Sequence, residues 1–269
     1  MGPPLRIALC TYSATRNTAV LSTAAAERLT DAGHTVERFD MLAGVRGEHP
    51  SLQVFDLIGL ATPVMLFRPP WVARRFLEQL GPLKPARPAF LILSSAGLPA
   101  NAAGTLRRLA KEKELYLGWC REVTCADSFI PFRKWFGTRL DRGRPDAASL
   151  DAVREFVDEV VADLAAGRRG QVPSRPHSPW HLLFQKAPED GATRLLGQRW
   201  LEETDCTGCG LCAGLCPTGA IRMEEALPRV EEAECLGCCA CFNRCPTRAW
   251  RLRRFAPRHF YAGPDRDEG

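Results

Sequence analysis

The chain has 269 residues and a formal charge of +5, from 36 basic and 31 acidic side chains. This length allows one domain of ordinary size and a small second module. The positive excess is too small and too dispersed to indicate a nucleic-acid-binding protein. No run of about twenty apolar residues predicts a membrane span, and the amino terminus shows no export signal, so we expect a cytoplasmic protein.

As far as Gly167, the chain alternates between short apolar runs and helical patterns. The runs expected to form strands are 5–13, 34–40, 55–63, 88–95 and 119–125. The patterns expected to form helices are 17–34, 69–81, 101–118 and 146–167, with Gly33 and Gly167 placed to end the first and the last. This alternation predicts an α/β fold with a doubly wound, parallel sheet of five strands, and ligands of such sheets bind beyond the carboxyl ends of the strands.

The loop after the first strand is rich in hydroxyl and amide side chains and leads directly into a helix. Its backbone N–H groups and the positive end of the helix dipole predict an anion-binding site. The side chains expected at this site are Ser13, Thr15, Arg16, Asn17 and Thr18. The alternative is a capped helix whose polar loop only satisfies its own amides.

This loop resembles the phosphate loop of flavodoxins, whose pattern is Ser or Thr, any residue, then Thr-Gly-Asn-Thr. Residues 13–18 match every fixed position except that Arg16 replaces glycine. The resemblance implies a flavodoxin-like fold and a noncovalently bound FMN. If the loop requires a positive φ at this position, Arg16 strains the backbone, although its guanidinium can pair with a phosphate.

The same resemblance implies that the loops after the third and fourth strands flank the flavin ring. The expected residues are Thr62, Pro63, Val64 and Met65 in one loop, and Ser94, Ser95, Ala96 and Gly97 in the other. Flavodoxins usually stack aromatic side chains there, whereas the second loop has only small residues, so we expect one face of the ring to be open. For the nearby aromatic residues, packing is the favoured interpretation over a cover for the ring; these are Trp71, Phe132, Trp135 and Phe136.

The pattern C-x2-C-x2-C-x3-C-P occurs twice, and the copies begin at Cys206 and Cys235. Eight thiolates with this spacing predict two 4Fe-4S clusters. Three closely spaced cysteines hold one cluster, and the fourth, followed by proline, ligates the other. The expected ligands are Cys206, Cys209, Cys212 and Cys245 for the first cluster, and Cys235, Cys238, Cys241 and Cys216 for the second.

Other uses of these cysteines fit less well. A zinc site needs two C-x2-C pairs and has no use for the third cysteine or the prolines. Disulfides between such near neighbours would strain the backbone. Cys239 is an extra thiol beside a ligand, and we favour a packed residue over a ligand there. Cys10, Cys120 and Cys125 lie in or beside strands and are expected to be buried; none has the neighbours of a catalytic nucleophile, and we predict no catalytic residue.

Residues 201–255 resemble the bacterial dicluster ferredoxins, which carry electrons between redox enzymes. The expected organisation is a flavodoxin-like domain (1–167), a Pro-rich linker (168–200), a small α+β dicluster ferredoxin domain (201–256) and a C-terminal tail (257–269). The whole chain resembles the flavodoxin-ferredoxin fusion proteins of bacteria and archaea.

The resemblance implies an electron-transfer protein that relays low-potential electrons between two 4Fe-4S clusters and FMN, with redox proteins as partners. Two alternatives remain open at this point. One is a flavin-dependent reductase of a small organic substrate, supplied with electrons by its own clusters. The other is a ferredoxin whose first domain binds no flavin and serves for docking.

Overall fold

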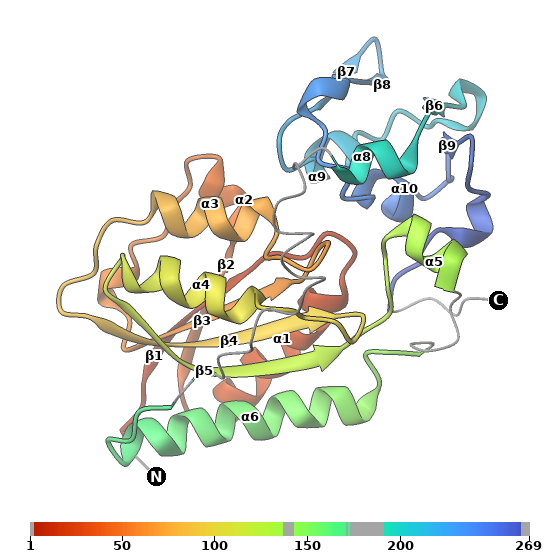
Figure 1. Cartoon of the computed structure of the whole chain (residues 1–269). Helices are drawn as coiled ribbons and strands as arrows, with labels where there is room; N and C mark the ends of the chain where they lie inside the picture. The colour runs from red at the N-terminus through yellow and green to blue at the C-terminus, as the bar shows by residue number, and fades with distance from the viewer. Residues whose placement is uncertain (1–2, 137–142, 171, 173–190, 265–269) are drawn as a thin grey trace. The chain divides into compact units, whose positions relative to one another are not determined.

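The computed structural model describes residues 3–136, 143–170, 172 and 191–264. These residues form two compact units (Figure 1). The first contains residues up to 125, apart from the loop segment 14–16, together with the described residues from 144 to 172. The second contains residues 126–136, 143 and 191–264, and the loop segment 14–16 is grouped with it.

The first unit is built on a five-stranded sheet in the order β2-β1-β3-β4-β5, and every neighbouring pair is parallel. The strands are β1 (Arg6–Thr11), β2 (Thr35–Asp40), β3 (Leu57–Pro63), β4 (Arg87–Ser95) and β5 (Leu115–Thr124). This is the strand order of the flavodoxin-like doubly wound fold, in which ligands bind where the strand order reverses, between β1 and β3. The predicted α/β class and sheet are therefore confirmed.

Helices cover both faces of this sheet. They are α1 (Asn17–Asp31), α2 (Met41–Val45), α3 (Trp71–Gln79), α4 (Ala102–Lys111) and α6 (Ala147–Ala165), with a 3-10 turn η1 (Leu52–Val54). Figure 1 shows α1 and α6 on one face and α3 and α4 on the other. Gly33 and Gly167 adopt φ values of 89° and 65° at the ends of α1 and α6, a conformation that glycine adopts without strain.

The apolar faces of α1 and α6 meet the sheet in one buried cluster. Leu21 and Ala25 of α1, and Phe156 and Val157 of α6, are at most 3% exposed and belong to the same cluster as the strand residue Phe90. Helices on both faces of the sheet explain why β3 is apolar along almost its whole length.

One predicted boundary was wrong. The helical pattern expected over 101–118 ends at Lys111, and β5 begins at Leu115, four residues before the predicted strand start at 119. Leu115 and Leu117 are buried, at the two-residue spacing of a strand, and β5 pairs with β4 from Leu115 onward. Pairing with a buried neighbouring strand therefore outweighs the helical propensity of this stretch. The short helix α2 was not predicted either.

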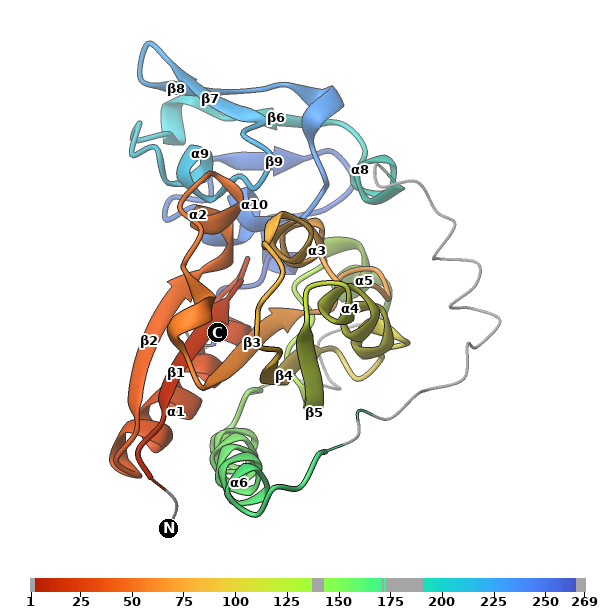
Figure 2. The same cartoon turned by 90° about the vertical axis from the view of Figure 1, so that its left-hand side faces the viewer.

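The second unit is a small α+β module, as expected (Figure 2). Its helices are α5 (Ile130–Phe136), α8 (Gly191–Leu196), α9 (Leu211–Leu215) and α10 (Ala240–Arg244), with 3-10 turns η2 (Glu203–Asp205), η3 (Glu232–Glu234) and η4 (Pro257–His259). Its strands form two antiparallel pairs, β6 (Arg199–Leu201) with β9 (Trp250–Leu252) and β7 (Ile221–Glu224) with β8 (Leu227–Val230).

The second unit includes chain that the sequence boundaries assign elsewhere. Helix α5 and the residues before it fall within the range expected for the first domain, and α8 and β6 begin within the range expected for the linker; residues 173–190 of that range lie outside the described residues. Asn243 of α10 connects the segment before α5 with the C-terminal residues, because its Nδ2 donates to the Ser128 carbonyl (2.8 Å) and its Oδ1 accepts from the Tyr261 amide (2.9 Å).

Arg133 of α5 makes a second connection of this kind. Its side chain is buried and donates from Nε to the carbonyl of His259 (3.0 Å) and from Nη1 to that of Asp127 (2.9 Å). Phe132 and Trp135 pack in the same unit, and the Trp135 ring lies 6.3 Å from that of Phe255. Across the ranges that the structure describes, no helix is long and apolar enough to cross a membrane.

Candidate functional site

Three loops meet at the carboxyl edge of the sheet. They follow β1, β3 and β4, which are adjacent: Thr11 pairs with Ala61, and Pro63 pairs with Ser94. The hydroxyl of Thr18, at the start of α1, shares a buried hydrogen bond with the hydroxyl of Ser94, at the end of β4 (2.7 Å). The sheet therefore brings together the residues predicted to hold a phosphate and those predicted to flank a ring.

The predicted phosphate loop has a left-handed residue at the position where the flavodoxin pattern has glycine. Arg16 adopts a φ of 78°, the left-handed conformation that glycine would adopt without strain. Thr15 and Asn17 are 5% and 6% exposed, whereas Arg16 is exposed. Helix α1 begins at Asn17, so the positive end of its dipole lies at this loop. The residues present thus fit a phosphate group.

The two loops expected beside the ring differ in shape. After β3, the backbone turns sharply: Met65 and Arg68 exchange two backbone hydrogen bonds, of 2.9 and 3.1 Å, and Leu66 and Phe67 between them have φ values of 47° and 62°. Such backbone strain in non-glycine residues is concentrated at functional sites. After β4, Ser94 and Ser95 are buried, whereas Ala96 and Gly97 are exposed and carry no bulky side chain.

Two hollows in the second unit are lined by the motif cysteines. Cys206, Cys209, Cys212 and Cys245 lie in the wall of the first hollow. These are the three closely spaced cysteines of the first copy and the last cysteine of the second. The volume of this hollow, including the part that is open to solvent, is about 340 Å³. Gly208 and Gly210 have φ values of 67° and 70°, so the loop curls around this hollow without strain.

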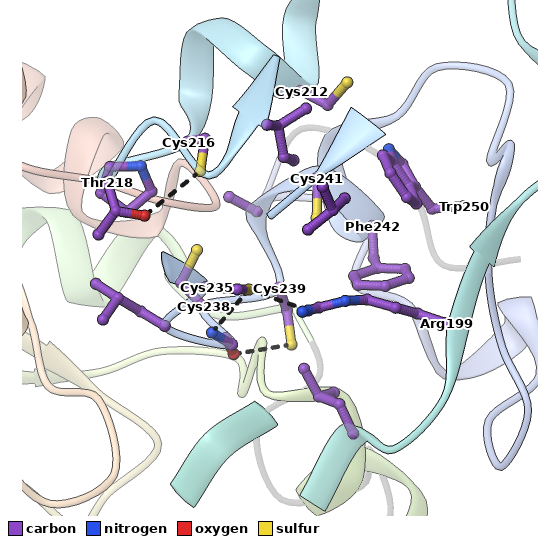
Figure 3. A pocket seen from close by; sticks show the side chains of 17 residues that line it. Arg199, Cys212, Cys216, Thr218, Cys235, Cys238, Cys239, Cys241, Phe242 and Trp250 are labelled. Carbon is purple, nitrogen blue, oxygen red and sulfur yellow. Dashed lines mark hydrogen bonds between the residues drawn. The ribbon is translucent and has the colours of Figure 1, made fainter. Parts of the chain in front are cut away.

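The second hollow, of about 460 Å³ measured in the same way, is shown in Figure 3. Its wall contains the crossed set of the second cluster, Cys235, Cys238, Cys241 and Cys216, and also Cys212 and Cys239. The donor sets are thiol-rich, which suits iron-sulfur clusters. Over the described ranges, no group of three or more His, Cys, Asp or Glu side chains is arranged to hold a single metal ion.

Burial makes the thiols of the second set poor acids on their own. It raises the pKa of Cys238 to about 12 and that of Cys241 well above its ordinary value. Burial also raises the pKa of Cys212, against the effect of a hydrogen bond from the Trp250 side chain. Because iron is bound by thiolates, cluster assembly would have to displace these protons.

Cys239 is buried and adopts a φ of 61° at the start of α10, where the first copy has Gly210 at the equivalent position. Its Sγ donates to the Gly237 carbonyl (3.5 Å), consistent with the favoured interpretation as a packed residue. Away from the motifs, Cys10 and Cys125 are buried as predicted, while Cys120 is only partly buried.

Arg199 is a site residue that the sequence did not reveal, because it lies in the range expected for a linker. Its guanidinium donates from Nη1 to the Sγ of Cys235 (3.0 Å) and from Nε to Glu232 (2.7 Å). Burial opposes the charge, but the hydrogen bond from Arg199 to Glu232 and the charge of Cys235 outweigh it and raise the pKa of Arg199 further. No spacing rule could have found this residue; only its place seven positions before Cys206 connects it with the motif.

Residues 200–222, which contain the first cysteine motif, match the family model of a 4Fe-4S binding domain. No curated protein matches the chain. The chain thus combines a flavodoxin-like sheet with a C-terminal 4Fe-4S binding domain.

Solved structures similar to the chain include a flavodoxin from Streptococcus pneumonia TIGR4 (14% identity, 59% of this chain, 99% of that chain, TM-score 0.40). Oxidised Flavodoxin 1 from Bacillus cereus is similar too (14% identity, 58% and 97%, TM-score 0.40). A third is the NAD(P)H:quinone oxidoreductase from Methanothermobacter marburgensis (12% identity, 65% and 100%, TM-score 0.39).

Proposed function

We propose that this chain, which joins a flavodoxin-like sheet to a 4Fe-4S binding domain, is an electron-transfer protein. In this proposal it relays low-potential electrons between two 4Fe-4S clusters and a noncovalently bound FMN, and it exchanges electrons with redox partner proteins. The observation that carries the proposal is the pairing of two thiol-lined hollows, each with the four cysteines of one crossed set in its wall.

The cluster ligands in this proposal are the eight motif cysteines. Clusters of this type exchange one electron at a time, whereas a flavin exchanges one or two, so the pair can connect one-electron and two-electron chemistry. The chain contributes the thiolates, the apolar walls that limit solvent access, and the hydrogen bonds to sulfur. Trp250 and Phe242 supply such walls, since both are buried beside the cysteines.

The residues proposed to hold FMN are those of the three loops. Thr15, Asn17 and the first amides of α1 would bind the phosphate, with Arg16 placed to neutralise its charge. The hydroxyl of Thr18 is engaged with Ser94 and would shape the loop rather than reach the phosphate through its side chain. Residues 62–65 and 94–97 would flank the ring.

The test is a stoichiometry on protein purified without oxygen. We expect about eight irons and one FMN per chain, a brown colour, and EPR signals of reduced 4Fe-4S clusters. Eight irons without flavin would favour the ferredoxin with a flavin-free docking domain. Bound zinc, with no cluster signal after reduction, would refute the electron-transfer proposal.

One observation favours a second candidate, a flavin-dependent reductase supplied by its own clusters. Ala96 and Gly97 are exposed and lack side chains able to cover a ring, and the next residue, Leu98, is 66% exposed. An uncovered ring face leaves room for a small organic substrate. Incubation of the holoprotein with quinones or nitroaromatics, under a continuous supply of electrons from an electrode, tests this. Consumption of substrate over many turnovers, above the rate without protein, supports a reductase, and its absence supports a carrier.

A further inference from the structure

Each cysteine motif is preceded by a glutamate that pairs with an arginine, and the two ion pairs have different surroundings. Glu203 and Glu232 occupy equivalent places, each three positions before the first cysteine of its motif. Each carboxylate binds an arginine: Glu203 binds Arg229 (3.0 Å), and Glu232 binds Arg199 (2.7 Å to Nε). The Arg229 side chain is 53% exposed, whereas that of Arg199 is 6% exposed. The second motif therefore has a buried charge where the first has a solvated one.

Arg199 directs this charge at a cluster ligand. Its Nη1 lies 3.0 Å from the Sγ of Cys235, and the guanidinium is in the wall of the second hollow (Figure 3). The amide of Gly237 also points at this sulfur (3.4 Å).

The first ligand set receives neutral donors from the described residues. The amide of Ala249 and the hydroxyl of Thr247 lie 3.3 and 3.6 Å from the Sγ of Cys245, and the Trp250 side chain bonds Cys212. Cys206 is the counterpart of Cys235, and among the residues that the structure describes none makes a hydrogen bond to its Sγ.

The position equivalent to Arg199 explains part of this asymmetry. Arg199 lies seven positions before Cys206, and the residue seven positions before Cys235 is Pro228. Pro228 lines the first hollow, just as Arg199 lines the second. Proline has neither a charge nor a backbone N–H, so it has nothing to donate to sulfur.

We propose that Arg199 separates the two clusters in reduction potential, so that the cluster held by Cys235, Cys238, Cys241 and Cys216 has the higher potential and collects the electron. The inference rests on the proposed function, because it requires both clusters to form. In the step itself, the first cluster loses one electron and the second gains it, with no bond broken and no proton moved.

The physical reason is electrostatic. Reduction adds a negative charge to the cluster, and a hydrogen bond from a cation to a ligand sulfur stabilises that charge. Burial of Arg199 strengthens the effect, since few water molecules remain to screen it. Glu232 partly offsets the charge, but its side chain is 63% exposed and therefore well solvated.

Three variants of the full chain, purified without oxygen, test the inference by a reductive titration followed by EPR. Arg199→Leu should lower the potential of the second cluster, changing the electron ratio between the clusters by about tenfold, which is about 59 mV for a one-electron couple. Glu232→Gln should raise the same potential, because Arg199 loses its counter-charge. Arg229→Leu removes the arginine from the solvated pair with Glu203 and should shift neither potential by a comparable amount.

Signals are assigned with Cys238→Ser and Cys209→Ser, each of which should alter one cluster. Equal shifts in Arg199→Leu and Arg229→Leu, or a shift of the first cluster instead, would overturn the inference. If the Arg199→Leu variant fails to assemble its second cluster, the Glu232→Gln variant provides the test. An unchanged potential of the second cluster in Glu232→Gln would then contradict the inference. Absence of clusters from the unmodified protein would instead refute the proposed function, so the two failures are distinguishable.

Discussion

Thr18 and Ser94 share a buried hydrogen bond, with their hydroxyl oxygens 2.7 Å apart, although they are far apart in the chain. Thr18 lies in the first turn of α1 and Ser94 near the end of β4. The bond therefore ties the proposed phosphate loop to one of the loops proposed to flank the ring. It requires β1, β3 and β4 to be adjacent and in parallel register.

Replacing either hydroxyl should destabilise the sheet domain. Thr18→Val and Ser94→Ala each leave one buried hydroxyl without its partner, at a cost of about 1–3 kcal/mol. The double variant should lose less than the sum, because neither unpaired group remains. Urea unfolding of the full chain, followed by circular dichroism, measures both effects. Thr23→Val on the same helix is the control, since Thr23 bonds the Arg38 side chain at an exposed position; strict additivity would contradict the predicted coupling.

The phosphate loop can be tested through flavin affinity. Thr15→Ala and Asn17→Ala should each weaken FMN binding about ten- to hundredfold, because each removes a hydrogen bond to a charged group worth about 1.5–3 kcal/mol. Iron content should stay unchanged. Fluorescence titration with FMN measures the affinity, and Thr23→Ala on α1 should leave it as in the unmodified protein. Unchanged affinity in both loop variants would remove the phosphate assignment.

The crossed ligation scheme predicts which cysteine variants should alter the same EPR signal. Cys209→Ser and Cys245→Ser should alter the same EPR signal, although the two residues belong to different motif copies, whereas Cys216→Ser should alter the other signal. The double variant Cys209→Ser/Cys245→Ser should therefore retain one unperturbed cluster. If Cys245→Ser instead resembles a Cys238→Ser variant, each motif holds its own cluster and the crossed scheme is wrong.

A variant of Cys239 can test whether this cysteine is a packed residue in a strained conformation or a cluster ligand. The Cys239→Gly variant should keep about eight irons per chain. Its free energy of unfolding should fall by no more than the packing of one small thiol contributes. The reason is that glycine relieves a left-handed residue with a φ of 61°, a gain of about 1 kcal/mol. Iron analysis and thermal unfolding measure the two quantities, and Cys238→Gly, one residue away, should lose iron. Loss of about four irons from Cys239→Gly would identify this cysteine as a ligand.

Local regularities were enough to predict much of the architecture. The apolar runs and helical patterns between residues 5 and 167 predicted the five strands, and the order β2-β1-β3-β4-β5 confirms a doubly wound sheet. The prediction failed where two structures compete for one stretch. Residues 113–118 continue a helical pattern, but pairing with β4 makes a strand of Leu115 and the residues after it.

Ligand spacing is also a local property. The repeated cysteine pattern required no fold to predict clusters, because a cubane of fixed size demands thiols at short, fixed intervals. In the same way, the match of residues 13–18 to a pattern with glycine at position 16 raised the question of a positive φ there, and the structure gives Arg16 a φ of 78°. Both follow from the chemistry of a few consecutive residues.

By itself, then, the sequence determined the type of sheet and the two copies of the cysteine motif, since each depends on neighbours within a few positions. Only the tertiary structure decided that α5 packs with the C-terminal module, that Thr18 meets Ser94, and that Arg199 donates to Cys235. Each of these contacts joins residues that are distant in the chain. Such contacts depend on burial and on strand pairing across the whole fold, which no local pattern encodes.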